Sequence, residues 1–311
     1  MVVEVDASPE EGQAHWQARQ IGRLRVDGAD IHYEVCGQGP AIVFAHGLGG
    51  SHMSWWQQVP YFSRRHTCVT FSHRGFASSS ADTGQPDPAR FADDLEALIE
   101  HLKIEQPHLV GQSMGGWTVV EYALRHPQRV RSLILSSTTG SIDSSLGAGF
   151  DQAAYETWRL QAEATALRCR SLGVHPAAGL RMAREQPDLH WLYLQMDGLS
   201  PALDKEALRS RLRAMRVRHP QVLAATRLPV LLLSPQEDIV ISPLALRSLA
   251  GEVAGVKLVE LPAMGHSPYF EAAPVFNQRL EEFIGNVDQE VQQARPISGL
   301  VVADPTKRST S

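Results

Sequence analysis

Short apolar runs alternate with helical patterns along most of the chain, and this alternation constrains the fold more than any other feature. Eight runs are candidate strands, at residues 23–26, 31–35, 41–45, 67–71, 108–110, 132–136, 229–233 and 256–261. Several are apolar throughout, which is typical of a parallel strand covered on both faces. Helical patterns lie between strands or after the last one, at residues 90–102, 114–125 and 273–284. The sequence therefore predicts an α/β fold with a mostly parallel eight-stranded sheet flanked by helices.

Two departures from this alternation refine the prediction. The turn Asp27-Gly28 between the first two runs favours an antiparallel hairpin at one edge of the sheet. Residues 138–227 contain several helical patterns and no convincing strand, which predicts an inserted helical cap over the sheet. We therefore expect four parts, namely a flexible N-terminal arm (1–20), a core (21–137 and 228–287), the cap (138–227) and a mobile C-terminal tail (288–311).

Composition excludes several classes of protein. The 311 residues are 43% hydrophobic and 20% charged, as in a soluble globular chain with a sizeable core. The net charge of −5, without a block of Lys or Arg, does not predict nucleic-acid binding. No apolar run is long enough for a membrane span, and the N-terminus lacks the pattern of a signal peptide. With three widely spaced cysteines (Cys36, Cys68 and Cys169) expected as reduced thiols, these features predict a cytoplasmic protein.

The candidate strand 108–110 runs directly into Gly111-Gln-Ser113-Met-Gly115 and then into a helical pattern. A tight turn between strand and helix, with this Gly-x-Ser-x-Gly spacing, exposes the serine hydroxyl at the edge of a sheet. The two glycines leave room where strand and helix approach closely. The start of the helix offers free N–H groups and a partial positive charge where an oxyanion would form. The motif therefore predicts that Ser113 is a nucleophile.

A serine nucleophile needs a histidine to take its proton, and in this type of fold the histidine comes last in the chain. His266 follows the last candidate strand and precedes the helical pattern at 273–284. The other histidines after Ser113 lie in helical or cap segments. His266 is therefore the predicted base.

The base must be oriented by a carboxylate that follows another strand. The loop after residues 229–233 holds two neighbouring carboxylates, Glu237 and Asp238. Asp238 is our prediction, and Glu237 is the alternative. Asp143, after the strand at 132–136, is a third possibility.

Four motifs together resemble those of α/β-hydrolase-fold enzymes, in particular serine hydrolases of the esterase and enol-lactonase type. They are residues 44–50 (Phe-Ala-His-Gly-Leu-Gly-Gly), 111–116, 237–243 and 265–266, and the resemblance spans about residues 21–287. It implies that the backbone N–H groups of Leu48 and Met114 form the oxyanion hole. It also implies that His46 supports this loop.

The chain departs from the family pattern after the fourth strand. The family often has Asp-x-Arg-Gly-x-Gly-x-Ser there, whereas residues 72–78 read Ser-His-Arg-Gly-Phe-Ala-Ser, with Ser72 in place of the Asp and Ala77 in place of the second Gly. Because these family positions mainly shape a turn, we interpret the change as a local structural variation.

Aromatic residues in two segments are candidates for the substrate pocket. The expected pocket residues are Trp158, Trp191 and Tyr193 in the cap, with His52, Trp55 and Trp56 at the entrance. Five arginines between residues 209 and 218 are expected to form a solvated helix face, with recognition of a substrate carboxylate as the alternative.

Meta-cleavage C–C hydrolases usually carry an aromatic residue after the catalytic histidine, but here Ser267 follows, and residues 265–271 look more like esterases and enol-lactonases. The resemblance therefore implies hydrolysis of a carboxylic ester or lactone of a small, mostly apolar substrate through an acyl-enzyme on Ser113. C–C bond hydrolysis, cofactor-free oxygenase or lyase chemistry, and ligand sensing remain alternatives. No cofactor or metal motif is present, and we expect no nucleic-acid or membrane partner. The oligomeric state stays open.

Overall fold

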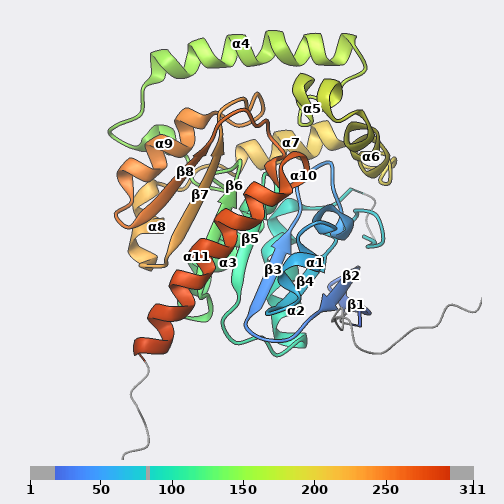
Figure 1. The fold of residues 1–311 in the computed structure, drawn as a ribbon, viewed down its shortest axis with the longest axis vertical. Helices are drawn as coiled ribbons and strands as arrows, with labels where there is room; N and C mark the ends of the chain where they lie inside the picture. Colours follow the sequence, from blue (N-terminus) through green and yellow to red (C-terminus); the bar gives the residue numbers. More distant parts are fainter. Residues whose placement is uncertain (1–17, 82–84, 295–311) are drawn as a thin grey trace, which may run out of the picture.

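The computed structural model describes residues 18–81 and 85–294, which form a twisted sheet covered by helices on both faces (Figure 1). The sheet has eight strands in the order β1-β2-β4-β3-β5-β6-β7-β8. The strands are β1 Gln20–Val26, β2 Ala29–Cys36, β3 Ala41–Ala45, β4 Thr67–Phe71, β5 His108–Gln112, β6 Ser132–Ser136, β7 Val230–Pro235 and β8 Val256–Leu261. β2 is antiparallel to both β1 and β4, and the remaining pairs are parallel. The α/β architecture, the eight strands and the edge hairpin are therefore confirmed.

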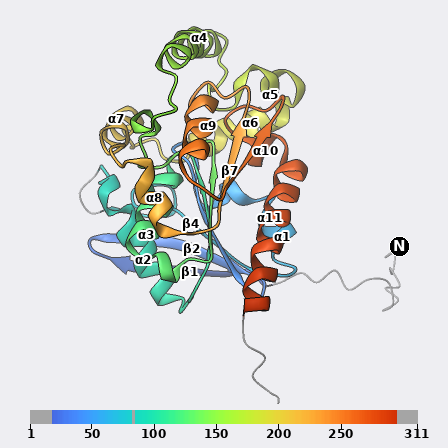
Figure 2. The same cartoon turned by 90° about the vertical axis from the view of Figure 1, so that its left-hand side faces the viewer.

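Helices cover both faces of this sheet (Figure 2). The α-helices are α1 Val59–Phe62, α2 Phe91–His101, α3 Gly115–Arg125, α4 Gln152–Ser171, α5 Gly179–Glu185, α6 Pro187–Asp197, α7 Lys205–Ala214, α8 Pro220–Thr226, α9 Pro243–Glu252, α10 Pro268–Glu271 and α11 Ala273–Ala294. Short 3-10 helices are η1 His52–Trp55, η2 Pro88–Arg90, η3 Pro127–Arg129 and η4 Ser144–Leu146. Within the described part of the chain, none of the helices is both long and apolar enough to cross a bilayer.

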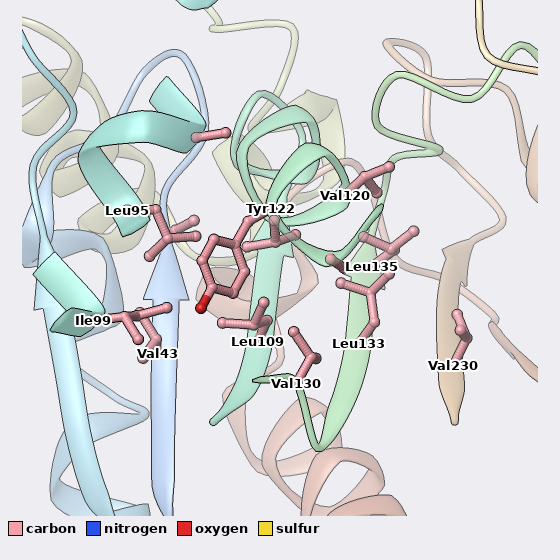
Figure 3. Close-up of a cluster of buried hydrophobic side chains, with 14 of the residues drawn as sticks. Val43, Leu95, Ile99, Leu109, Val120, Tyr122, Val130, Leu133, Leu135 and Val230 are labelled. Carbon is pink, nitrogen blue, oxygen red and sulfur yellow. The ribbon is translucent and has the colours of Figure 1, made fainter. Parts of the chain in front are cut away.

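Alternating side chains of the strands build two apolar layers. Val43, Leu109 and Leu133 belong to the layer beneath α2 and α3 (Figure 3). The intervening residues, such as Phe44 and Val110, face the opposite layer with α1 and α11. Burial on both faces explains why β3 and the central residues of β5 and β6 are apolar.

The segment between β6 and β7 is helical, but its last helix does not lie over the end of the sheet. α4 runs across the top of the molecule, apart from the strands (Figure 1). α8 instead packs against α3 and α9, and its Leu223 is buried in the layer beneath α2 and α3. The expected boundary of the cap at residue 227 therefore needs correction, because α8 belongs to the helices that cover the sheet.

The expected C-terminal tail also begins later than residue 288. α11 continues to Ala294, and Asp288 is held by the His108 ring at 3.2 Å and by Arg131 at 2.8 Å. These contacts tie the last turns of α11 to the sheet. The remaining expected tail (295–311) and residues 1–17 of the expected N-terminal arm lie outside the described residues, while residue 20 of that arm already belongs to β1.

A buried ion pair between Arg74, just after β4, and Asp94 of α2 gives a test of the fold. Arg74 Nε donates to Asp94 Oδ2 at 2.7 Å, and both side chains are at least nine-tenths buried. Burial raises the pKa of Asp94. Removing the Asp94 carboxylate therefore destabilises the protein mainly because the buried guanidinium of Arg74 is left without a partner. We expect Asp94→Ala to lower the free energy of unfolding by about 3–5 kcal/mol, measured by urea denaturation.

The neighbouring Asp93 supplies the control for this measurement. Asp93 pairs with Arg90 and Arg125 at the surface, so Asp93→Ala should cost less than about 1 kcal/mol. Equal losses in the two variants would show that burial of the Arg74 pair does not matter.

Candidate active site

Ser113 occupies a strained turn between β5 and α3. Its φ angle is 49°, in the left-handed region that non-glycine residues rarely adopt. A Cβ atom on Gly115 would lie 2.1 Å from the carbonyl oxygen of Ala45, and one on Gly111 would lie 2.6 Å from a methyl group of Val119. Neither position has room for a side chain. The turn therefore depends on both glycines of the motif.

The loop at residues 46–50 passes beside this turn. A Cβ on Gly47 would lie 3.3 Å from Ser113 Cβ and 2.1 Å from Gln112 Oε1. Leu48 and Met114 pack in the same apolar cluster together with Trp117. The two residues predicted to form the oxyanion hole are thus brought together next to Ser113.

His46 holds this loop from beneath. Its Nδ1 lies 2.8 Å from the Gly47 carbonyl oxygen, and its Nε2 accepts the backbone N–H of His73 at 3.0 Å. Nε2 therefore carries the lone pair, and Nδ1–H donates to the carbonyl. Burial lowers the pKa of His46 to about 3, so the ring is neutral and acts as a fixed support.

His266 and Asp238 form a buried pair at the ends of β8 and β7. His266 Nδ1 lies 2.8 Å from Oδ2 and 3.1 Å from Oδ1 of Asp238. Asp238 Oδ1 also accepts the N–H groups of Val240 and Ile241, at 2.7 and 2.9 Å. With the proton on Nδ1 directed to the carboxylate, the lone pair of His266 Nε2 is available to act as a base.

The two alternative carboxylates lie elsewhere. Glu237 is exposed and pairs with Arg181. Asp143 accepts the N–H of Ser145 at the start of η4, at 3.0 Å. Of the three carboxylates considered from the sequence, it is Asp238 that contacts His266.

Two side chains that the sequence analysis did not single out join these loops. Gln112 Nε2, next to Ser113, donates to the carbonyl oxygen of His266 at 3.0 Å. Glu271 accepts the N–H of Gly265 at 2.7 Å, and burial raises the pKa of Glu271 to about 7. Gln112 lies within the motif at residues 111–116, and Glu271 lies at the end of residues 265–271. Their positions in these two motifs could have indicated a role at the site.

Polar side chains from α6 and its surroundings lie against the loop at residues 46–50. A Cβ on Gly49 would lie 2.8 Å from Asp197 Oδ1 and 3.5 Å from the Tyr193 hydroxyl. Lys205 Nζ donates to Asp197 at 2.6 Å, and His175 Nε2 lies 3.7 Å from the same carboxylate. Burial raises the pKa of Tyr193 to about 12 and lowers that of His175 to about 4. Of this group the sequence analysis had chosen Tyr193 alone.

The other expected pocket residues are scattered. Trp158 Nε1 donates to the backbone carbonyl of Asp238 at 3.2 Å, which places Trp158 near the His266–Asp238 pair. Trp191 is 65% exposed on α6, and Trp56 is 44% exposed beside Phe270. These two side chains face solvent rather than an enclosed pocket.

Two entrance predictions need correction. Trp55 is fully buried and packs between Phe44 and Tyr269, so it belongs to the core. His52 is buried against β2, and its Nδ1 lies 3.0 Å from Ser72 Oγ. His52 and Trp55 are the first and last residues of η1, and both side chains of this single turn point into the protein.

Comparisons with known proteins identify the family and the fold. A family model described as alpha/beta hydrolase fold matches residues 40–273. A putative carbamate hydrolase, RutD, from Azorhizobium caulinodans is 26% identical over 266 residues, which cover 84% of this chain and 97% of that protein.

Two solved structures share the fold. Est816, described as an N-acyl homoserine lactone degrading enzyme, has a TM-score of 0.67 and 24% identity over 84% of this chain and all of that one. The enol-lactonase from Burkholderia xenovorans has a TM-score of 0.66 and 24% identity over 85% of this chain and all of that one. With the family model matching most of its length, the chain belongs to the alpha/beta hydrolase fold family.

Proposed function

We propose that this α/β-hydrolase cleaves a carboxylic ester or lactone of a small, mostly apolar substrate through an acyl-enzyme on Ser113. The observation that carries the proposal is the convergence of three loops. Ser113 lies beside Gly47, its neighbour Gln112 binds the carbonyl of His266, and the His266 ring is paired with Asp238. A strained serine, a buried His–Asp pair and a glycine-rich loop are the parts that acyl transfer requires.

Each of these parts has a role in the reaction. Ser113 Oγ attacks the carbonyl carbon while His266 Nε2 takes its proton, and Asp238 stabilises the imidazolium that forms. The N–H groups of Leu48 and Met114 donate to the oxyanion. His266 then gives the proton to the departing alkoxide, and a water molecule activated by His266 releases the acid from Ser113.

The preference for an ester or lactone is supported by the names of the relatives. Carbamates, acyl homoserine lactones and enol-lactones all carry a heteroatom on the carbonyl carbon. The apolar cluster of Leu48, Met114 and Trp117 favours an apolar group near Ser113. The Tyr193 hydroxyl beside the loop accepts from Ser267 Oγ at 3.5 Å, and its own proton can be donated to a polar atom of the substrate.

The test is hydrolysis of p-nitrophenyl esters of increasing acyl length, together with a γ-lactone series. We expect saturable turnover, with one acyl length giving the highest kcat/KM, and that length measures the space available beside Ser113. A folded wild-type protein that hydrolyses neither series would contradict the proposal. It would favour the C–C hydrolase, oxygenase or lyase, and receptor alternatives.

A further inference from the structure

Three side chains outside the triad gather between β2 and η1. His32 and Glu34 are two residues apart on β2, so they project from the same face of the strand. His52, the first residue of η1, meets them there. Glu34 Oε1 lies 3.5 Å from His32 Nε2 and 3.4 Å from His52 Nε2, and all three atoms lie within 4.8 Å of one another.

These separations match the geometry of a metal centre. With Zn–N and Zn–O bonds of about 2.0–2.1 Å, neighbouring ligand atoms in a tetrahedral zinc site lie about 3.3–3.4 Å apart. The two measured distances are close to that edge length and long for hydrogen bonds. Glu34 Oε1 is therefore already at ligand spacing from both imidazoles, and a ligand atom of each of the three residues lies within 4.8 Å of the other two.

His32 gives a second, independent indication. Its ring is about nine-tenths buried, and Nε2, the atom that faces Glu34, has no hydrogen-bond partner among the described residues. A buried polar atom without a partner is costly, so such atoms are uncommon and call for an explanation. A metal ion bound to this nitrogen would supply the missing partner.

The surroundings also suit metal binding. Ser72 Oγ accepts the backbone N–H of His52 at 3.0 Å and lies 3.0 Å from its Nδ1. A hydroxyl that accepts Nδ1–H leaves the lone pair of Nε2 free for a metal, which is the usual outer support of a histidine ligand. Ser72 stands where the family often has Asp. Arg19 Nη1 lies 3.6 Å from Glu34 Oε2, whereas the two imidazoles lie near Oε1 of the same carboxylate.

We propose that His32, Glu34 and His52 bind one divalent transition metal ion of the zinc class. Two imidazole nitrogens favour such an ion over Mg²⁺ or Ca²⁺, which prefer oxygen ligands. A water molecule fills the fourth position. Because η1 directly follows the loop at residues 46–50, the ion clamps the end of that loop to β2.

Binding is tested on tag-free, chelator-treated full-length protein titrated with Zn²⁺ and, separately, Co²⁺. We expect one Zn²⁺ per chain by calorimetry, a rise in Tm with Zn²⁺, and the intense visible bands of tetrahedral Co²⁺. His32→Gln, Glu34→Gln and His52→Gln should each weaken Zn²⁺ binding at least about tenfold and remove the Co²⁺ bands, and Ser72→Ala should weaken binding about 10–100-fold.

The matched control is His126→Gln. His126 also faces a glutamate, with Nε2 3.0 Å from Glu96, but this pair is not part of a three-ligand group among the described residues, so its loss should leave Zn²⁺ affinity unchanged. Circular dichroism establishes that each variant is folded. Wild-type affinity no higher than that of folded His32→Gln, or octahedral Co²⁺ spectra alike in all proteins, would overturn the proposal. Neither result depends on turnover, so the proposed hydrolysis is tested separately.

Discussion

Replacing Ser113 with alanine is expected to lower kcat for ester hydrolysis about 10⁵–10⁶-fold. The serine oxygen forms the bond to the acyl group, and alanine offers no atom that could replace it. Any residual rate would come from the oxyanion donors and from substrate binding. Because alanine and serine both carry a Cβ, the strain at a φ of 49° stays similar, and the Tm should stay close to that of the wild type.

The rates are measured by steady-state kinetics with the best p-nitrophenyl ester. Mass spectrometry then follows labelling by a phosphonate that reacts with activated serines. The wild type should gain one label on Ser113, and Ser113→Ala should gain none. Ser171→Ala, which changes an exposed serine at the end of α4, controls for loss of a hydroxyl. Undiminished hydrolysis by Ser113→Ala would remove this residue from the mechanism.

The parts of the site that follow from local sequence could be predicted. The turn at Ser113 depends on Gly111 and Gly115, whose neighbours leave no space for a Cβ. The central residues of the buried strands are mostly apolar because helices cover both faces of the sheet. Chain order was enough to select His266 and to limit the acid to three carboxylates, because parallel strands bring their carboxyl ends to one edge of the sheet. The contact with His266 then distinguishes Asp238 from Glu237 and Asp143.

Contacts between distant helices and loops could not be predicted in this way. Asp197 and Tyr193 reach the loop at residues 46–50 because of how α6 packs, and no local pattern encodes that packing angle. Lys205, at the start of α7, pairs with Asp197. Trp55 and Trp56 are neighbours in the chain, yet one is buried in the core and the other faces solvent. Their roles depend on the direction of a single turn of 3-10 helix.

Asp238→Asn is expected to lower kcat about 10⁴-fold while the protein stays folded. Asp238 accepts Nδ1–H of His266, and an asparagine that turns its NH₂ group toward the ring would favour the tautomer with the proton on Nε2. That ring cannot take the proton of Ser113. The amide oxygen of asparagine can still accept the N–H groups of Val240 and Ile241, so the loop keeps its shape.

The neighbouring carboxylate makes this experiment decisive. Glu237→Gln removes an equal charge one residue away, but Glu237 pairs with Arg181 at the surface, so kcat should change less than about twofold. Asp143→Asn, at the start of η4, should likewise leave kcat nearly unchanged. The three variants are compared with the same ester, and thermal unfolding checks that each is folded. A large loss of kcat in Glu237→Gln or Asp143→Asn, with near-normal turnover in Asp238→Asn, would assign the acid to another residue.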